Sequence, residues 1–145
     1  MAIKVANNQS LTAITALPSA ITSGAMILLE TQTASSSSTI SFTSGIDSTY
    51  KEYVFKFINM QSASTDVAFQ VNFRDGGSSY DATKTTTTYI TQHNEAGTSA
   101  ELSYSSSFDL AQSTAVQPLA EAVGNGNDEC LSGELTLFNP SSTTY

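Results

Sequence analysis

Two runs of the sequence decide the fold class: residues 51–60, KEYVFKFINM, and residues 67–74, VAFQVNFR. The second run alternates apolar and polar residues without a break, which is the signature of a β-strand with one buried face. In the first run Tyr53, Phe55 and Phe57 share one face, while the other face is also largely apolar. Apolar residues on both faces are typical of a central strand. These runs predict a β protein.

The rest of the chain carries further strand patterns. The additional predicted strands are residues 26–33, 37–43, 84–91, 101–105 and 130–138. We expect the first two to form a hairpin around residues 34–36. Residues 113–123 hold the only clustering of Ala, Glu, Gln and Leu, which favours a helical turn or two after Pro118. Short strands with regular turn signals predict an all-β fold, an antiparallel β-sandwich or jelly-roll-like domain over residues 25–145.

Residues 1–24 differ from this pattern and predict an extended N-terminal arm. Four apolar residues recur in it at spacings of three, three and four: Leu11, Ile14, Leu17 and Ile21. The spacing suits a helix, but Pro18 and the β-branched residues oppose one. We therefore expect an irregular arm whose apolar side chains dock on another protein. The alternative is that the segment forms the first strand of the domain's own core.

Composition and charge exclude several classes of partner. Thirteen acidic and five basic residues give a net charge of −8 without a basic patch, which argues against nucleic-acid binding. The longest apolar run, residues 25–29, is far shorter than the roughly 20 residues of a membrane-spanning helix. Residues 1–8 lack the apolar core of a secretion signal. The single cysteine, Cys130, cannot form an internal disulfide, and we expect it to be a small buried hydrophobe.

No set of residues stands out as catalytic or metal-binding, so we expect a protein that is not an enzyme and holds no cofactor. A nucleophile triad would need His93, the only histidine, with an acid such as Glu95 or Asp81, and no motif exposes a serine beside them. One His and one Cys are too few for a transition-metal site. Residues 124–129, GNGNDE, lack the alternating acidic ligands of a Ca²⁺ loop and predict an exposed loop.

Tyrosines near the predicted loops point to a second class of function. Sugar sites commonly stack an aromatic ring on the apolar face of the sugar. The chain has no Trp, but Tyr80, Tyr89 and Tyr104 lie in or near loops, so we consider them candidate glycan contacts. The alternative is that each is a structural tyrosine with a buried ring and a solvated hydroxyl.

The last residues of the sequence repeat an earlier pattern. Residues 139–145, NPSSTTY, resemble residues 44–50, SGIDSTY, which lead directly into the run at 51–60. By analogy we expect a strand to follow Tyr145. That strand would belong either to a longer chain or to a neighbouring subunit, because an open sheet edge invites aggregation.

Five segments of the sequence share a pattern with one protein family. They are residues 8–18, 29–36, 40–55, 110–115 and 135–145. Together they resemble virion structural proteins of tailed phages, especially marine phages. The resemblance spans nearly the whole chain, and members of the family continue by several more strands beyond the segment that ends here at Tyr145.

The resemblance implies a non-enzymatic structural protein that decorates the capsid or forms part of a head or tail fibre. It would be assembled in the host cytoplasm, reside in the virion and contact other capsid or tail proteins. Four apolar side chains of an arm offset its ordering cost only if several copies act together, which favours a homo-oligomer, and we expect a trimer. The alternative function is a glycan-binding adhesin module of the virion that recognises a host surface.

Overall fold

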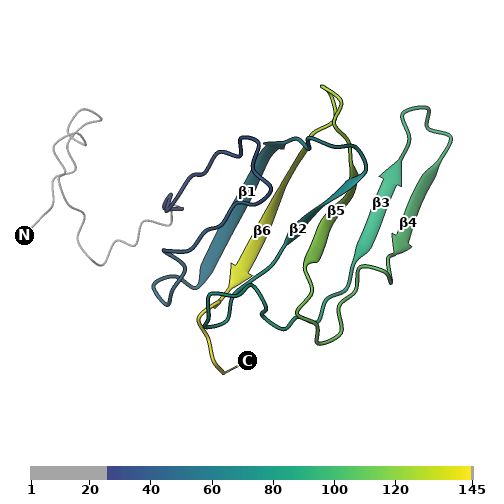
Figure 1. The fold of residues 1–145 in the computed structure, drawn as a ribbon. Coiled ribbons are helices and arrows are strands. Elements are labelled where there is room, and N and C mark those ends of the chain that lie inside the picture. The colour runs from purple at the N-terminus through teal and green to yellow at the C-terminus, as the bar shows by residue number, and fades with distance from the viewer. Residues whose placement is uncertain (1–25, 145) are drawn as a thin grey trace, which may run out of the picture. The chain divides into compact units, whose positions relative to one another are not determined.

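The computed structural model describes residues 26–144, and this part of the chain contains six β-strands and no helix. The strands are β1 (Glu52–Met60), β2 (Val67–Val71), β3 (Tyr89–His93), β4 (Ala100–Tyr104), β5 (Gln117–Val123) and β6 (Leu131–Phe138). They form three antiparallel pairs, β1–β6, β2–β5 and β3–β4 (Figure 1). The all-β prediction is confirmed for these residues. The chain divides after Thr33 into two compact units.

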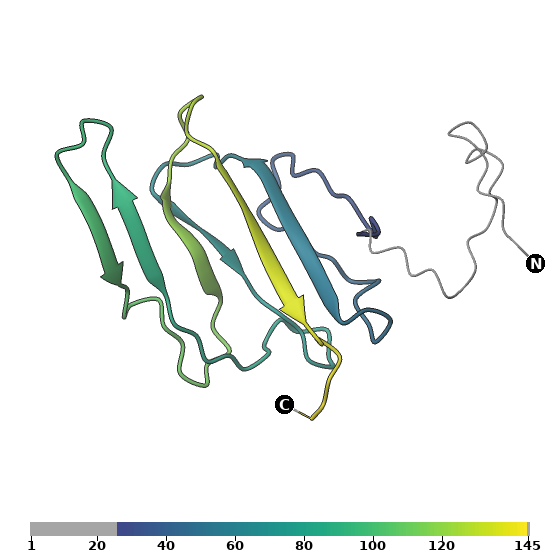
Figure 2. The same cartoon turned by 180° about the vertical axis from the view of Figure 1, so that it is seen from behind.

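The pairing of the first two sheets is nested. β1 and β2 follow each other in the chain, yet β1 pairs with β6 and β2 pairs with β5. Figure 2 shows the two pairs from behind. The rings of Phe57 on β1 and Phe69 on β2 meet edge to face, with centroids 4.9 Å apart. An aromatic contact of this kind contributes about 0.5–1.5 kcal/mol beyond the burial of the rings, so it ties the two sheets together.

The register of the β1–β6 pair explains the two-sided pattern of residues 51–60. One face carries Tyr53, Phe55 and Phe57, which lie opposite residues 137, 135 and 133 of β6. On the other face the ammonium group of Lys56 lies 3.5 Å from the carboxylate of Glu134. This ion pair is more than half exposed, so it contributes little stability. The aromatic face is therefore what stabilises the pair.

Tyr53 is the most buried of the described residues, with 4% of its surface exposed. Its hydroxyl donates a hydrogen bond to the carbonyl of Asp47 (2.9 Å) and accepts one from the amide of the same residue (3.0 Å). The carboxylate of Asp47 in turn accepts a bond from the amide of Thr49 (2.7 Å). Hydrogen bonds to the buried Tyr53 side chain therefore fix the turn that precedes β1.

Gln117, at the start of β5, is the other buried residue of the described segment, at 8% exposure. Its Oε1 accepts a hydrogen bond from the hydroxyl of Thr86 (2.6 Å). Its Nε2 donates to the carbonyls of Phe108 (3.2 Å) and Pro118 (2.9 Å). A buried amide is stable only when its polar atoms are bonded, and here it joins β5 to the segments that precede β3 and follow β4.

The predicted hairpin of residues 26–33 and 37–43 is wrong, because no strand occurs among residues 26–50. The apolar side chains of the first segment are exposed, from 49% at Leu29 to 82% at Leu28. Two strands alone are only marginally stable in water unless a hydrophobic face packs against them. The apolar residues of this segment therefore lack the packed partner that a strand would need.

The predicted helical turns in residues 113–123 are also wrong. Most of this segment is strand β5, in which Pro118 lies opposite Gln70 of β2. Helix propensity is a weak preference that tertiary pairing overrides. The irregular register of the pair places Ala122 in a left-handed conformation with φ of +49°.

Two further predictions need correction. In the predicted strand 84–91, β3 begins only at Tyr89, and Lys84 makes an isolated bridge to Ser113. The thiol of Cys130 is exposed rather than buried, because β6 begins one residue later. The predicted strands 51–60, 67–74, 101–105 and 130–138 are confirmed as β1, β2, β4 and β6, with ends that differ by one to three residues.

Candidate functional site

The structure describes only one of the two predicted sets of site residues, the tyrosines. Leu11, Ile14, Leu17 and Ile21 lie outside the described residues, so docking through the arm stays a prediction. All three candidate tyrosines lie within them.

Tyr89 and Tyr104 lie side by side on the β3–β4 hairpin. They are Cα partners at the first residue of β3 and the last residue of β4. Their ring centroids are 5.8 Å apart and the planes are inclined by 54°. The side chains are 69% and 56% exposed, unlike structural tyrosines with buried rings. The hairpin therefore presents an aromatic pair to solvent.

Tyr80 lies apart from this pair, in the connection between β2 and β3. The guanidinium carbon of Arg74 lies 5.3 Å from the centroid of its ring, a distance at which a cation attracts an aromatic face. The side-chain amide of Asn72 donates a hydrogen bond to the carbonyl of Tyr80 (2.6 Å). Tyr80 is thus engaged within its own loop.

Asp109 holds Tyr104 in place. The hydroxyl of Tyr104 donates a short hydrogen bond to one oxygen of the Asp109 carboxylate. The other oxygen accepts a bond from the amide of Thr88 (2.8 Å). The hydrogen bond to Asp109 raises the pKa of Tyr104, and the nearby negative charge adds to this effect. The Asp109 carboxylate therefore links Thr88, the residue before β3, to Tyr104, the last residue of β4.

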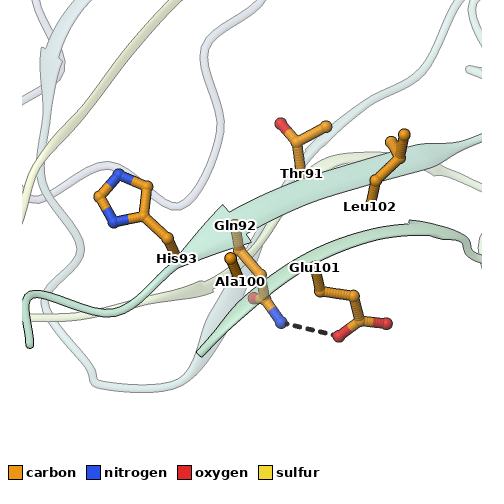
Figure 3. A pocket seen from close by; sticks show the side chains of 6 residues that line it. All are labelled: Thr91, Gln92, His93, Ala100, Glu101 and Leu102. Atoms are coloured by element: carbon orange, nitrogen blue, oxygen red, sulfur yellow. Dashed lines mark hydrogen bonds between the residues drawn. The ribbon is translucent and has the colours of Figure 1, made fainter. Parts of the chain in front are cut away.

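The rest of the hairpin forms a shallow open hollow lined by residues 91–93 and 100–102 (Figure 3). Thr91 and Leu102 lie opposite each other on the face that also carries the tyrosine pair. Gln92 and Glu101 project from the opposite face, where the Gln92 amide donates to the Glu101 carboxylate (3.3 Å). The tyrosine face therefore carries no Asp, Glu, Lys or Arg side chain among residues 89–93 and 100–104.

The residues considered for catalysis and metal binding have other partners. His93 Nδ1 lies 3.1 Å from the carbonyl oxygen of Asn94. The Glu129 carboxylate folds back and accepts a hydrogen bond from the amide of Gly126 (2.7 Å). Within residues 26–144 no three His, Cys, Asp or Glu residues form a group that could hold a metal ion. In the same part of the chain there is no helix with the length and hydropathy needed to span a bilayer.

Sequence reasoning missed two residues of this region. Leu102 is 75% exposed in the middle of β4, and the pattern of residues 100–104 predicts a strand without showing that one edge of it is open. Asp109 carried no signal, because Thr88, Tyr104 and Asp109 meet only after the hairpin has formed. Both roles depend on contacts between separate segments.

Comparison with known proteins gives no relative: none of the protein-family models matches the chain, and no curated protein or solved structure matches it. The resemblance to phage virion proteins therefore stays a prediction from the sequence.

Proposed function

We propose that the chain is a non-enzymatic structural protein of a phage virion, which decorates the capsid or forms part of a head or tail fibre. The observation that carries the proposal is the amount of apolar strand surface left uncovered. Ile58 on β1, Leu102 on β4 and Phe138 at the end of β6 are 75%, 75% and 71% exposed. Exposed apolar side chains on three strands that also have open edges in the described part of the chain favour association with another chain, which supports a subunit that is completed by its neighbours.

The pairing of the strands supports the same function. Each sheet of the described segment has two strands, whereas independent stability usually needs three or more strands or a second packed layer. We propose that β1–β6 and β2–β5 are two layers of a sandwich that meet at Phe57 and Phe69. Strands from neighbouring subunits would extend these layers.

In this proposal the N-terminal arm anchors the protein on other capsid or tail proteins, and the copies associate as a trimer. Apolar residues such as Leu11 and Ile14 would be buried in the assembled particle, which forms in the host cytoplasm. Burying each such side chain contributes about 1.5–3 kcal/mol. Several arms acting together would hold a subunit far more firmly than one.

Three measurements test the proposal. Antibodies raised against residues 34–144 should label phage particles in immuno-electron microscopy, and a chain lacking residues 1–22 should fold but fail to join those particles. Light scattering should give the mass of a trimer for the full chain. A folded monomer that is absent from particles would contradict the proposal, and loss of the fold on deletion would show that the arm is part of the core.

A specific observation favours a second candidate function, a glycan-binding adhesin module of the virion. Tyr89 and Tyr104 present adjacent exposed rings, and Asp109 fixes the second of them. Binding on a glycan array should be lost in both Tyr89→Ala and Tyr104→Ala. Tyr80→Ala is the matched control, because Tyr80 lies in a separate loop. Binding that depends on Tyr80 alone, or no binding to any host polysaccharide, would exclude the hairpin as a glycan site.

A further inference from the structure

The outer edge of β4 has a regular set of unpaired peptide groups. The amide of Ser105 bonds to the carbonyl of Thr88 (2.9 Å), and the amide of Asn94 bonds to the carbonyl of Ser99 (3.0 Å). These two bonds lie at either end of the β3–β4 pair. In an antiparallel pair, every second residue of a strand directs its peptide groups at the partner strand and the residues between direct theirs away. Glu101 and Ser103 therefore bond to β3, and the peptide groups of Ala100, Leu102 and Tyr104 point away from it.

That edge is uncovered in the described part of the chain. β4 lies at the end of the row of strands in both views (Figures 1 and 2). No hydrogen bond among residues 26–144 reaches the outward peptide groups of Ala100, Leu102 or Tyr104. An open edge of this kind is a template for pairing with another strand.

We infer that the occupant of this edge is β4 of a second copy, paired antiparallel about a two-fold axis through Leu102. In this register Leu102 lies opposite the partner's Leu102, and Ala100 lies opposite the partner's Tyr104. All three outward positions then form hydrogen-bonded pairs at once. The two hairpins join into one four-stranded antiparallel sheet, which satisfies the rule that three or more strands are needed for stability.

The charge pattern of β4 selects this register. Glu101 is the one charged residue of the strand, and in this register it lies opposite the partner's Ser103. Moving the axis to Glu101 would place two carboxylates directly opposite each other, which is destabilising. Moving it to Ser103 would leave the outward peptide group of Ala100 without a partner. Of these three registers, the one with the axis at Leu102 is therefore the most favourable for pairing two copies of the edge.

The side chains support the same contact. Leu102, at the axis, is 75% exposed in the single chain, and its equivalent in the second copy would cover it. The uncharged face with Tyr89 and Tyr104 would continue across the axis, so apolar side chains meet apolar side chains. Glu101 remains on the opposite face, beside Gln92.

This contact goes beyond the proposed function, because it depends only on the geometry of β4. A two-fold contact closes on two copies and cannot build a trimer, but it can link two trimers. A five-residue edge buries less than the roughly 1,200–2,000 Å² of a stable interface. The contact should therefore be weak between free chains and should strengthen where copies are held close together.

Disulfide trapping tests the inference on the full chain. With Cys130→Ser as background, Leu102→Cys places two thiols at the axis, where Cα atoms of a hydrogen-bonded antiparallel pair lie about 5.5 Å apart. That separation lies within the range of about 4.4–6.8 Å found for disulfides. The matched control is Glu101→Cys, which is also exposed on the same strand but lies opposite the partner's Ser103. We expect a disulfide-linked dimer from Leu102→Cys, and none from Glu101→Cys.

A second variant measures the contact without a cross-link. Leu102→Lys places like charges at the axis, while Val116→Lys changes an exposed apolar residue (45% exposed) that lies just before β5 and outside the proposed contacts. At high concentration only Leu102→Lys should remove the even-numbered species seen by light scattering. No dimer from Leu102→Cys, or equal dimer from Glu101→Cys, would overturn the inference. Trimers whose association into even-numbered species is unaffected by Leu102→Lys would leave the proposed function standing while overturning the edge pairing.

Discussion

The phenol oxygen of Tyr53 lies 2.9 Å from the carbonyl oxygen and 3.0 Å from the amide nitrogen of Asp47, so one side chain bonds to both backbone groups of a single residue. This arrangement orders the turn that leads into β1. On the aromatic face of β1, Phe55 contacts Phe42 and Phe57 contacts Phe69. The stability of the described core depends on how firmly this turn is attached.

Removing the hydroxyl in Tyr53→Phe should destabilise the fold. Both backbone groups of Asp47 lose their partner while the ring stays buried. Because Asp47 is exposed, water can replace the lost bonds, so the expected cost is that of an ordinary hydrogen bond, about 0.5–1.5 kcal/mol. Urea denaturation measures the change in the free energy of unfolding. Tyr50→Phe is the control, because Tyr50 is 37% exposed and should change stability by less than about 0.5 kcal/mol. Equal effects of the two variants would contradict this role of Tyr53.

The turn should also loosen in acid. Hydrogen bonds from the side chain and amide of Thr49 lower the pKa of Asp47 below its usual value of 3.8. A lowered pKa in the folded state means that the carboxylate stabilises the turn above pH 3.8 and that this contribution is lost as pH falls through the folded pKa. An NMR titration of the Thr49 amide should show its transition below pH 3.8. A transition above that value would contradict the bond.

Replacing the buried amide in Gln117→Leu should uncouple β5 from the segments around the hairpin. The hydroxyl of Thr86 and the carbonyl of Phe108 lose partners, and the expected loss is about 1–3 kcal/mol of unfolding free energy for each group left unsatisfied. Amide exchange of residues 84–88 should accelerate. Gln70→Leu, at an exposed position of β2, should leave that exchange unchanged. Protection that survives Gln117→Leu would show that the amide is not the link.

Asp109→Asn should change the titration of Tyr104. Because the bond to Asp109 is the main cause that raises the pKa of this tyrosine, removing the negative charge should lower it toward the ordinary value of 10.0. Ultraviolet absorbance of the phenolate follows the change, with Tyr104→Phe identifying the signal. The folded pKa is raised, so the bond's contribution to stability is present below pH 10 and is lost as pH rises through the folded pKa. An unchanged titration would contradict the contact.

Ala122→Gly should stabilise the chain modestly. Ala122 has a φ of +49°, a conformation that costs a residue with a Cβ about 1–2 kcal/mol. Glycine adopts it without that cost but loses more entropy on folding, about 0.5–1 kcal/mol. The net gain should be about 1 kcal/mol or less and should appear as a higher midpoint of thermal unfolding. Ala120→Gly, at a position of β5 that pairs with Phe69 and has no positive φ, should lower the midpoint, and a lower midpoint in both variants would contradict the strain at Ala122.

Strand positions were largely readable from the sequence, whereas the candidate site was not. The alternation in residues 51–60 and 67–74 predicts β1 and β2 because side chains of a strand point to opposite faces at every second residue. The predicted strand at residues 26–33 does not form, since pairing also needs a partner that the local sequence cannot identify. The weak helical signal after Pro118 was overridden by the backbone of β2.

The sequence by itself determined that the chain is all-β over the described residues and which side chains of β1 share a face, because both follow from a period of two along the backbone. Only the tertiary structure decided that Tyr89 lies beside Tyr104, that Asp109 bonds to Thr88 and Tyr104, and that β4 has an open edge. These relationships join residues that are far apart in the chain, and their energies arise from pairing and burial that exist only once separate segments have met.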